Sequence, residues 1–223
     1  MRAADAALSS RAMNARRSVG LELLAIGVAA AIFVATFRVR PAYVDFVLAG
    51  VMVALVAASA RRSRRFWDEA ALVPGGGASR RAWIESGVFT GVALLVLVAL
   101  AVRTAGSGSA LAARVANWHL AVALPLYFGW GLLQQYIFQR FLLGRLLQLL
   151  PAGAAIALTA IAFSSVHFPR WPVMALVLIA CSVWSTIYYR TRALLPLAAS
   201  HALLGSVLHY WVFGNDLLHG WLV

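Results

Sequence analysis

Long apolar stretches constrain this chain most, because a bilayer-spanning helix needs roughly 20 mostly apolar residues. The chain has 223 residues, of which 63% are hydrophobic and 12% are charged, and its mean hydropathy is +0.84. This composition is too apolar for an ordinary soluble domain, and the alternating pattern of a membrane barrel is absent. Helices satisfy their own backbone hydrogen bonds in lipid. The sequence therefore predicts an all-α, polytopic membrane helix bundle.

Segments with charge, proline or glycine separate about seven such stretches, since these residues end helices or are costly in lipid. The expected spans are residues 18–37, 42–60, 83–102, 117–139, 152–168, 172–189 and 194–213. All 19 basic residues are arginine, and with the N-terminus inside, 14 lie in inner segments and 5 in outer ones. Because basic residues favour cytoplasmic loops, this bias predicts a cytoplasmic N-terminus. It also explains the net charge of +12 without nucleic acid as a partner.

The predicted organisation has four parts. They are a cytoplasmic tail (1–17), N-terminal transmembrane helices with a basic loop (18–116), a core with the polar motifs (117–213) and a C-terminal tail (214–223). The first apolar stretch is expected to remain as a span, because we find no cleavage site after it. Residues 66–72 of the basic loop suggest a short interfacial helix. A multi-pass protein of a bacterial-type plasma membrane is expected, with the bilayer as its partner.

Polar residues within the expected spans are informative, because lipid makes each of them costly. They fall in three places: Gln134, Gln135 and Gln139; Ser164, Ser165 and His167; His201 and His209. Helical spacing places each group on a stripe, since residues four apart share a face. Phe163 and His167 form one such pair. The lone Cys181 lies in an apolar run and is expected to be a buried packing residue.

Two of these stripes are expected to lie at the same height. Gln135 and His167 each lie 16 residues from Pro151, where a helical hairpin would turn. The spacing predicts that Gln134 or Gln135 approaches His167, with His201 across a polar cavity. The plainer alternative is that the glutamines hold helices together through amide hydrogen bonds, worth about 1 kcal/mol each.

These residues resemble the motifs of the CPBP family, the CAAX-protease and bacteriocin-processing proteins, also called the ABI family. That family has Glu-Glu-x-x-x-Arg, Phe-x-x-x-His and His-x-x-x-Asn on separate helices. Here the first motif falls on Gln134–Gln139, the second on Phe163–His167 and the third on His201–Gly205. The resemblance covers roughly residues 117–210. It implies an intramembrane endopeptidase in which the first glutamate activates water and the third motif stabilises an oxyanion.

The resemblance assigns catalytic positions to Gln134, Gln135, Gln139, His167 and His201, and binding positions to Phe163, Gly205 and His209. Glutamine replaces both glutamates and the arginine, and glycine replaces the asparagine. An amide cannot take up a proton at physiological pH, and general-base catalysis contributes about 10²–10⁴-fold. Two negative charges and one positive charge are absent together, which leaves no uncompensated buried arginine. The peptidase chemistry is therefore expected to be impaired or altered.

Three alternatives remain open at this level. The chain is an inactive binding, immunity or scaffold protein, a peptidase with a rewired site, or a small transporter. In a rewired site, His167, His201 and His209 would act as the base or bind zinc, since neutral imidazoles suit that metal. A membrane or prenylated peptide is the expected substrate. His209 either donates in place of the missing asparagine, in space left by Gly205, or belongs to an interfacial belt with Tyr210 and Trp211.

Overall fold

The computed structural model describes residues 17–25, 27–28, 31–32, 35, 47, 50–51, 53–54, 57–58, 77–216 and 218. Within these ranges the protein is helical and contains no strand, which confirms the all-α prediction for this part of the chain. The expected spans 18–37 and 42–60 are described only in part, and every described residue within them is helical. The expected interfacial helix at 66–72 lies outside the described residues.

The chain divides into two compact units. One contains Met1–Ala71 and Ile137–Ser185, and the other contains Leu72–Tyr136 and Thr186–Val223. The first unit holds most of η1 (Tyr136–Leu143), α7 (Gly144–Leu146), α8 (Ala152–Ser165) and the larger part of α9 (Trp171–Thr191). The second unit holds α4 (Gly77–Ala105), α5 (Gly108–Val115), α6 (His119–Gln135), the end of α9, α10 (Leu195–Val207) and η2 (Leu208–Val212).

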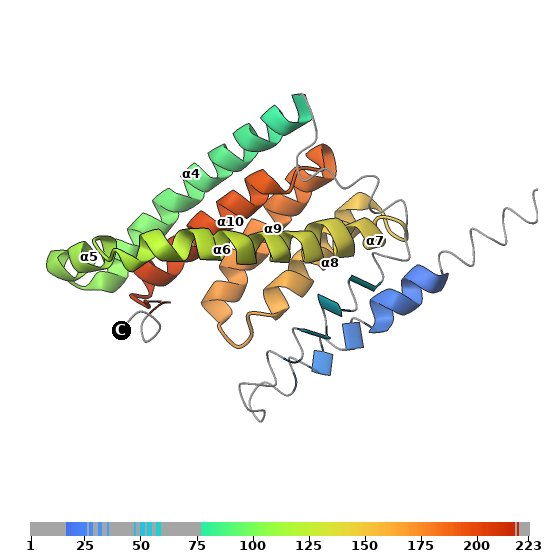
Figure 1. The fold of residues 1–223 in the computed structure, drawn as a ribbon, viewed down its shortest axis with the longest axis horizontal. Coiled ribbons are helices and arrows are strands. Elements are labelled where there is room, and N and C mark those ends of the chain that lie inside the picture. The colour runs from blue at the N-terminus through green and yellow to red at the C-terminus, as the bar shows by residue number, and fades with distance from the viewer. Residues whose placement is uncertain are drawn as a thin grey trace, which may run out of the picture. The chain divides into compact units, whose positions relative to one another are not determined.

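Helix α10 forms the core of the second unit. It packs against both α6 and α4, and its continuation η2 packs against α4 and α5. Figure 1 shows α4 and α10 running side by side. Leu197, Ala198 and Val207 are almost completely buried. Pro196 lies in the first turn, where its missing N–H removes no helical hydrogen bond. A helix that is apolar on nearly all sides is expected at the centre of a bundle.

Two helices among the described residues, α4 and α9, are long and apolar enough to cross a membrane, and α8 is a shorter apolar helix. Helix α4 has 29 residues, which corresponds to about 43 Å at 1.5 Å per residue. Its exposed side chains are mostly large and apolar, among them Ile84, Val88, Val92, Leu95 and Val102. A surface of this kind suits contact with lipid. The full set of about seven spans and the cytoplasmic N-terminus stay predictions.

The turn expected after the span at 83–102 is present but leads into a short helix that the sequence reasoning missed. Gly106 adopts a positive φ of 73°, which ends α4. Ser107 then caps α5, and its side chain accepts a hydrogen bond from the backbone N–H of Ala110 at 3.2 Å. A serine directly before a helix is a common start signal.

In the first unit, α8 is shorter than the sequence predicted. It begins directly after Pro151 and ends at Ser165 rather than at residue 168. His167 therefore lies in the turn that follows the helix, where its N–H donates to the carbonyl of Ser164 at 3.0 Å. Residues 136–143 form a π-helix in place of the expected α-helix. Wider turns of this kind often occur at functional sites, and this one coincides with the glutamine motif.

Candidate active site

Gln139 lies on η1 and is almost completely buried. The hydroxyl of Ser185 donates to its Oε1 at 2.8 Å, and its Nε2 donates to the Sγ of Cys181 at 3.4 Å. Both partners come from α9. Because a buried amide is costly unless it is hydrogen-bonded, these contacts explain why a neutral residue is stable here. The position at which the family has arginine is thus built for an amide.

Cys181 is buried, as the sequence predicted. Besides the contact with Gln139, its sulfur lies 3.8 Å from Ser185 Oγ and 4.0 Å from the carbonyl oxygen of Thr159 on α8. Two small polar groups of α9 thereby contact the amide of η1, and the Thr159 carbonyl of α8 contacts one of them. Gln139, Cys181, Ser185 and Thr159 thus form a packed polar contact inside the first unit, and none of these four residues is acidic.

The second motif pair is held by an aromatic cluster. His167 and Phe163 have ring centroids 5.4 Å apart, and Phe163 also packs against Phe138 at 4.6 Å and Trp184 at 6.4 Å. His167 Nδ1 lies 3.0 Å from the carbonyl oxygen of Phe163, which can only accept. The proton is therefore assigned to Nδ1, and Nε2 carries the lone pair. That is the tautomer that a base or a hydrogen-bond acceptor requires.

The third motif lies in the second unit, where the stripe of His201, Gly205 and His209 faces α6. A Cβ built at Gly131 of α6 would lie 3.6 Å from the His201 ring and 3.5 Å from the carbonyl oxygen of Ala198. These are ordinary van der Waals distances, so His201 lies directly against α6 at this position. His201 itself is buried.

Tyr127 of α6 packs against this stripe and was not among the residues that the sequence predicted. A Cβ built at Gly205 would overlap the Tyr127 ring, with Cζ at 2.9 Å and the hydroxyl oxygen at 3.0 Å. The ring lies between the two histidines, with centroid distances of 6.0 Å to His201 and 6.4 Å to His209. Tyr127, rather than His209, thus fills the space beside Gly205. His209 packs on Tyr127 and on Phe213, the latter at 6.0 Å.

Gln134 and Gln135 end α6. Gln134 is half-buried, while Gln135 is 1% exposed, and its Oε1 has no hydrogen-bond partner among the described residues. Spacing places Gln135 on the same face of α6 as Tyr127 and Gly131, at i, i+4 and i+8. The two glutamines lie in the second unit and His167 lies in the first. The predicted approach of either glutamine to His167 therefore stays a prediction.

The carboxylates that the structure describes are engaged elsewhere. Glu22 lies 3.4 Å from Arg145 in the first unit. Glu85 contacts Arg81 at 2.5 Å and Arg190 at 3.9 Å in the second. Each of these acids has its own cation. None of these three ion pairs includes a motif residue.

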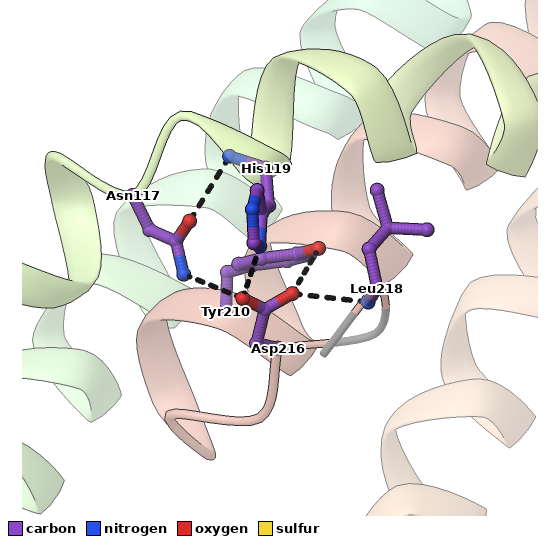
Figure 2. Close-up of polar contacts among 5 residues, drawn as sticks. All are labelled: Asn117, His119, Tyr210, Asp216 and Leu218. Carbon is purple, nitrogen blue, oxygen red and sulfur yellow. Dashed lines mark hydrogen bonds and ion pairs between the residues drawn. The ribbon is translucent and has the colours of Figure 1, made fainter. Parts of the chain in front are cut away.

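Asp216 is the third described carboxylate and lies just beyond η2 (Figure 2). It accepts hydrogen bonds from Asn117, His119, Tyr210 and the N–H of Leu218, at 2.5 to 3.2 Å. Burial opposes the charge, but these four donors hold the pKa of Asp216 well below its usual range. Asn117 also accepts from the N–H of His119 at 3.0 Å. The network fastens Asp216 and Leu218 to the start of α6.

The histidines considered as zinc ligands do not form a cluster in the part of the chain that the structure describes. Among these residues no group of three or more histidine, cysteine, aspartate or glutamate side chains could hold a metal ion. In the second unit the Tyr127 ring lies between His201 and His209. The geometry therefore favours hydrogen bonding and ring packing at these histidines.

Comparison with known proteins gave one family. The family model described as "Type II CAAX prenyl endopeptidase Rce1-like" matches residues 116–207. No curated protein and no solved structure matches the chain. The matched segment holds every position of the three motifs, while His209 lies beyond it. This match agrees with the resemblance inferred from the motifs: residues 116–207 are similar to the Rce1-like CAAX endopeptidase family.

Proposed function

We propose that this protein is a multi-pass membrane protein of the CAAX-protease type that no longer hydrolyses peptides through a glutamate and instead binds a membrane-borne, prenylated peptide. The observation that carries the proposal is the environment of Gln139. Its amide is buried and bonded to Ser185 and Cys181. Such an environment suits a neutral side chain and gives no counter-charge to an arginine.

Loss of the general base follows from the residue types. Gln134 and Gln135 cannot accept a proton from water. The described carboxylates Glu22, Glu85 and Asp216 are each held by other partners. Without a glutamate base at these motif positions, the attack of water on a peptide carbonyl would lose about 10²–10⁴-fold in rate.

Binding groups persist in the same segment. Gln135 offers a buried carbonyl oxygen that lacks a partner among the described residues. A peptide N–H would supply that hydrogen bond, and satisfying a buried acceptor is worth about 1–3 kcal/mol. His167 presents an acceptor nitrogen on a ring fixed by Phe163. Hydrogen-bond acceptors that persist while both motif glutamates are absent support a binding site.

The test uses the full-length protein in proteoliposomes with a farnesylated peptide that carries a photo-crosslinker. We expect the wild type to crosslink but not to cleave, and the variant Gln134→Glu/Gln135→Glu to gain cleavage. The matched control is Gln148→Glu, an exposed glutamine bonded to the carbonyl of Gly144 outside the motifs. Cleavage by the wild type at the rate of the double variant would contradict the proposal, as would failure to crosslink.

A rewired peptidase is the second candidate, and the tautomer of His167 favours it. With Nδ1–H bonded to Phe163, Nε2 is available to accept a proton. In the same assay this candidate requires that the wild type cleaves and that His167→Ala abolishes cleavage. His119→Ala is the control, because His119 binds Asp216 outside the motifs.

A further inference from the structure

A group of arginines lies at one end of the second unit. Arg80 and Arg81 lie near the start of α4, and Arg190 and Arg192 lie at and just after the end of α9. All four are exposed. Glu85 joins two of them, with Arg81 at 2.5 Å and Arg190 at 3.9 Å. Four guanidinium groups and one carboxylate leave a strongly basic surface.

This surface coincides with the end of the apolar face of α4. From Arg81 to Arg103 the helix rises about 33 Å at 1.5 Å per residue, close to the roughly 30 Å of a bilayer's hydrocarbon core. The side chains exposed between them include Ile84, Val88 and Leu95. Arg81 is therefore placed where hydrocarbon gives way to headgroups.

Exposed aromatic residues lie close to Arg81 and Arg190 in the sequence. Trp83 is 50% exposed and Tyr189 is 43% exposed, and each lies within two residues of Arg81 or Arg190. Tryptophan and tyrosine favour the membrane interface because their rings are apolar with a polar edge. The two helices that qualify as spans thus present arginine and an aromatic residue together at one interface.

Glu85 orients the arginines without neutralising the group. Its carboxylate draws Arg81 and Arg190 together, although their side chains remain 56% and 51% exposed. Arginine binds phosphate through two parallel N–H donors, and two arginines side by side can contact one phosphate. We propose that Arg81 and Arg190, held by Glu85, bind the phosphate of an anionic phospholipid in the adjacent leaflet. The proposal is independent of whether the motif residues hydrolyse peptides.

The test is titration of lipid-stripped, full-length protein in neutral detergent with phosphatidylglycerol, followed by native mass spectrometry. Near the surface each arginine contributes about 1 kcal/mol toward anionic lipid. We therefore expect Arg81→Gln/Arg190→Gln to weaken phosphatidylglycerol binding about 30-fold, with phosphatidylcholine binding unchanged. The matched control is Arg103→Gln/Arg170→Gln, which removes the same charge from two other exposed positions and should weaken binding less than about threefold.

Equal weakening in the two double variants would overturn the proposal, because it would show a general effect of net charge. Inorganic phosphate is added in a further arm. Displacement of the lipid by phosphate at equal concentration would identify a free phosphate site and reject the lipid. Thermal midpoints in neutral detergent confirm folding of each variant. If the glutamine pair unfolds, Arg81→Lys/Arg190→Lys keeps the charge without the paired donors, and affinity equal to that of the wild type would contradict the proposed phosphate geometry.

Discussion

Gln139 shows at the scale of one residue how a motif position becomes neutral and remains stable. Its Oε1 accepts from Ser185 and its Nε2 donates to Cys181. Both partners are neutral side chains. An arginine at this position would need a carboxylate to compensate its charge. A neutral side chain at position 139 is therefore stabilised by residues of α9 as well as by its own place on η1.

The single substitution Gln139→Arg is expected to destabilise the protein by about 3–5 kcal/mol, because it buries a charge without a partner. Gln139→Leu should cost less, about 1–3 kcal/mol, since it removes the neutral contacts with Ser185 and Cys181 without burying a charge. Chemical unfolding in mild detergent measures both. An equal decrease in the free energy of unfolding for the two variants would show that the buried charge does not cause the destabilisation.

Gly205 and Tyr127 form a second residue-scale prediction. Gly205→Ala forces a Cβ into the Tyr127 ring, and overpacking of this kind costs about 1–3 kcal/mol. In the background Tyr127→Ala the same change should cost at least about 1 kcal/mol less, which a double-mutant cycle reports as coupling. Gly87→Ala is the control, because a Cβ there meets no atom within 4 Å. Additive effects at Tyr127 and Gly205 would contradict the overlap.

At the scale of elements, side chains of other helices fix the end of η2. Arg114 of α5 donates to the carbonyl oxygens of Trp211 and Val212, each at 3.1 Å. Thr104 of α4 also donates to Val212, at 2.6 Å. These donors satisfy the carbonyls that a helix C-terminus leaves unpaired. Asp216 then links the end of η2 to the start of α6 through Tyr210, Asn117 and His119.

Stability is expected to depend on the charge of Asp216 in a defined pH range. The folded pKa of Asp216 is lowered, so its contribution is complete above about pH 4, the value of an unfolded aspartate. It is lost as the pH falls through the lower folded value. Thermal midpoints should therefore show Asp216→Asn less stable than the wild type at pH 7, with a difference that narrows in acid. A constant difference down to about pH 2 would contradict this linkage.

The long apolar elements were predictable from sequence because their length and flanking charges are local properties. Residues 83–102 were expected as a span, and α4 covers Gly77–Ala105. The early end of α8 and the π geometry of η1 and η2 were not predictable, because wide turns have no apolar periodicity of their own. Helix α5 had a local signal in Ser107, which marks its start.

The candidate site divides in the same way. The stripe of His201, Gly205 and His209 follows from spacing on one helix. Tyr127 belongs to another helix, and only the packing of α6 on α10 reveals its place beside Gly205. A spacing signal did exist, since Tyr127, Gly131 and Gln135 recur every four residues. The partners of Gln139 lie more than 40 positions away, at Cys181 and Ser185, and no local pattern indicates them.

At the scale of the whole molecule, the family match and the apolar helices together support membrane embedding. The match covers residues 116–207, and α4, which precedes it, is one of the two helices able to cross a bilayer within the described ranges. The distribution of arginines predicts a cytoplasmic N-terminus. Reporter fusions after Arg65 and after Arg103 should therefore lie on opposite sides of the membrane. Reporters on the same side would reject the predicted set of spans.

The fit of Tyr127 against Gly205 also ties two helices together through one side chain. The first atom of any side chain at position 205 overlaps the present place of the Tyr127 ring, so that ring must shift before α6 and α10 can keep their spacing. A larger residue at position 205 is therefore best accommodated together with a smaller residue at position 127, and the two positions are expected to change as a pair.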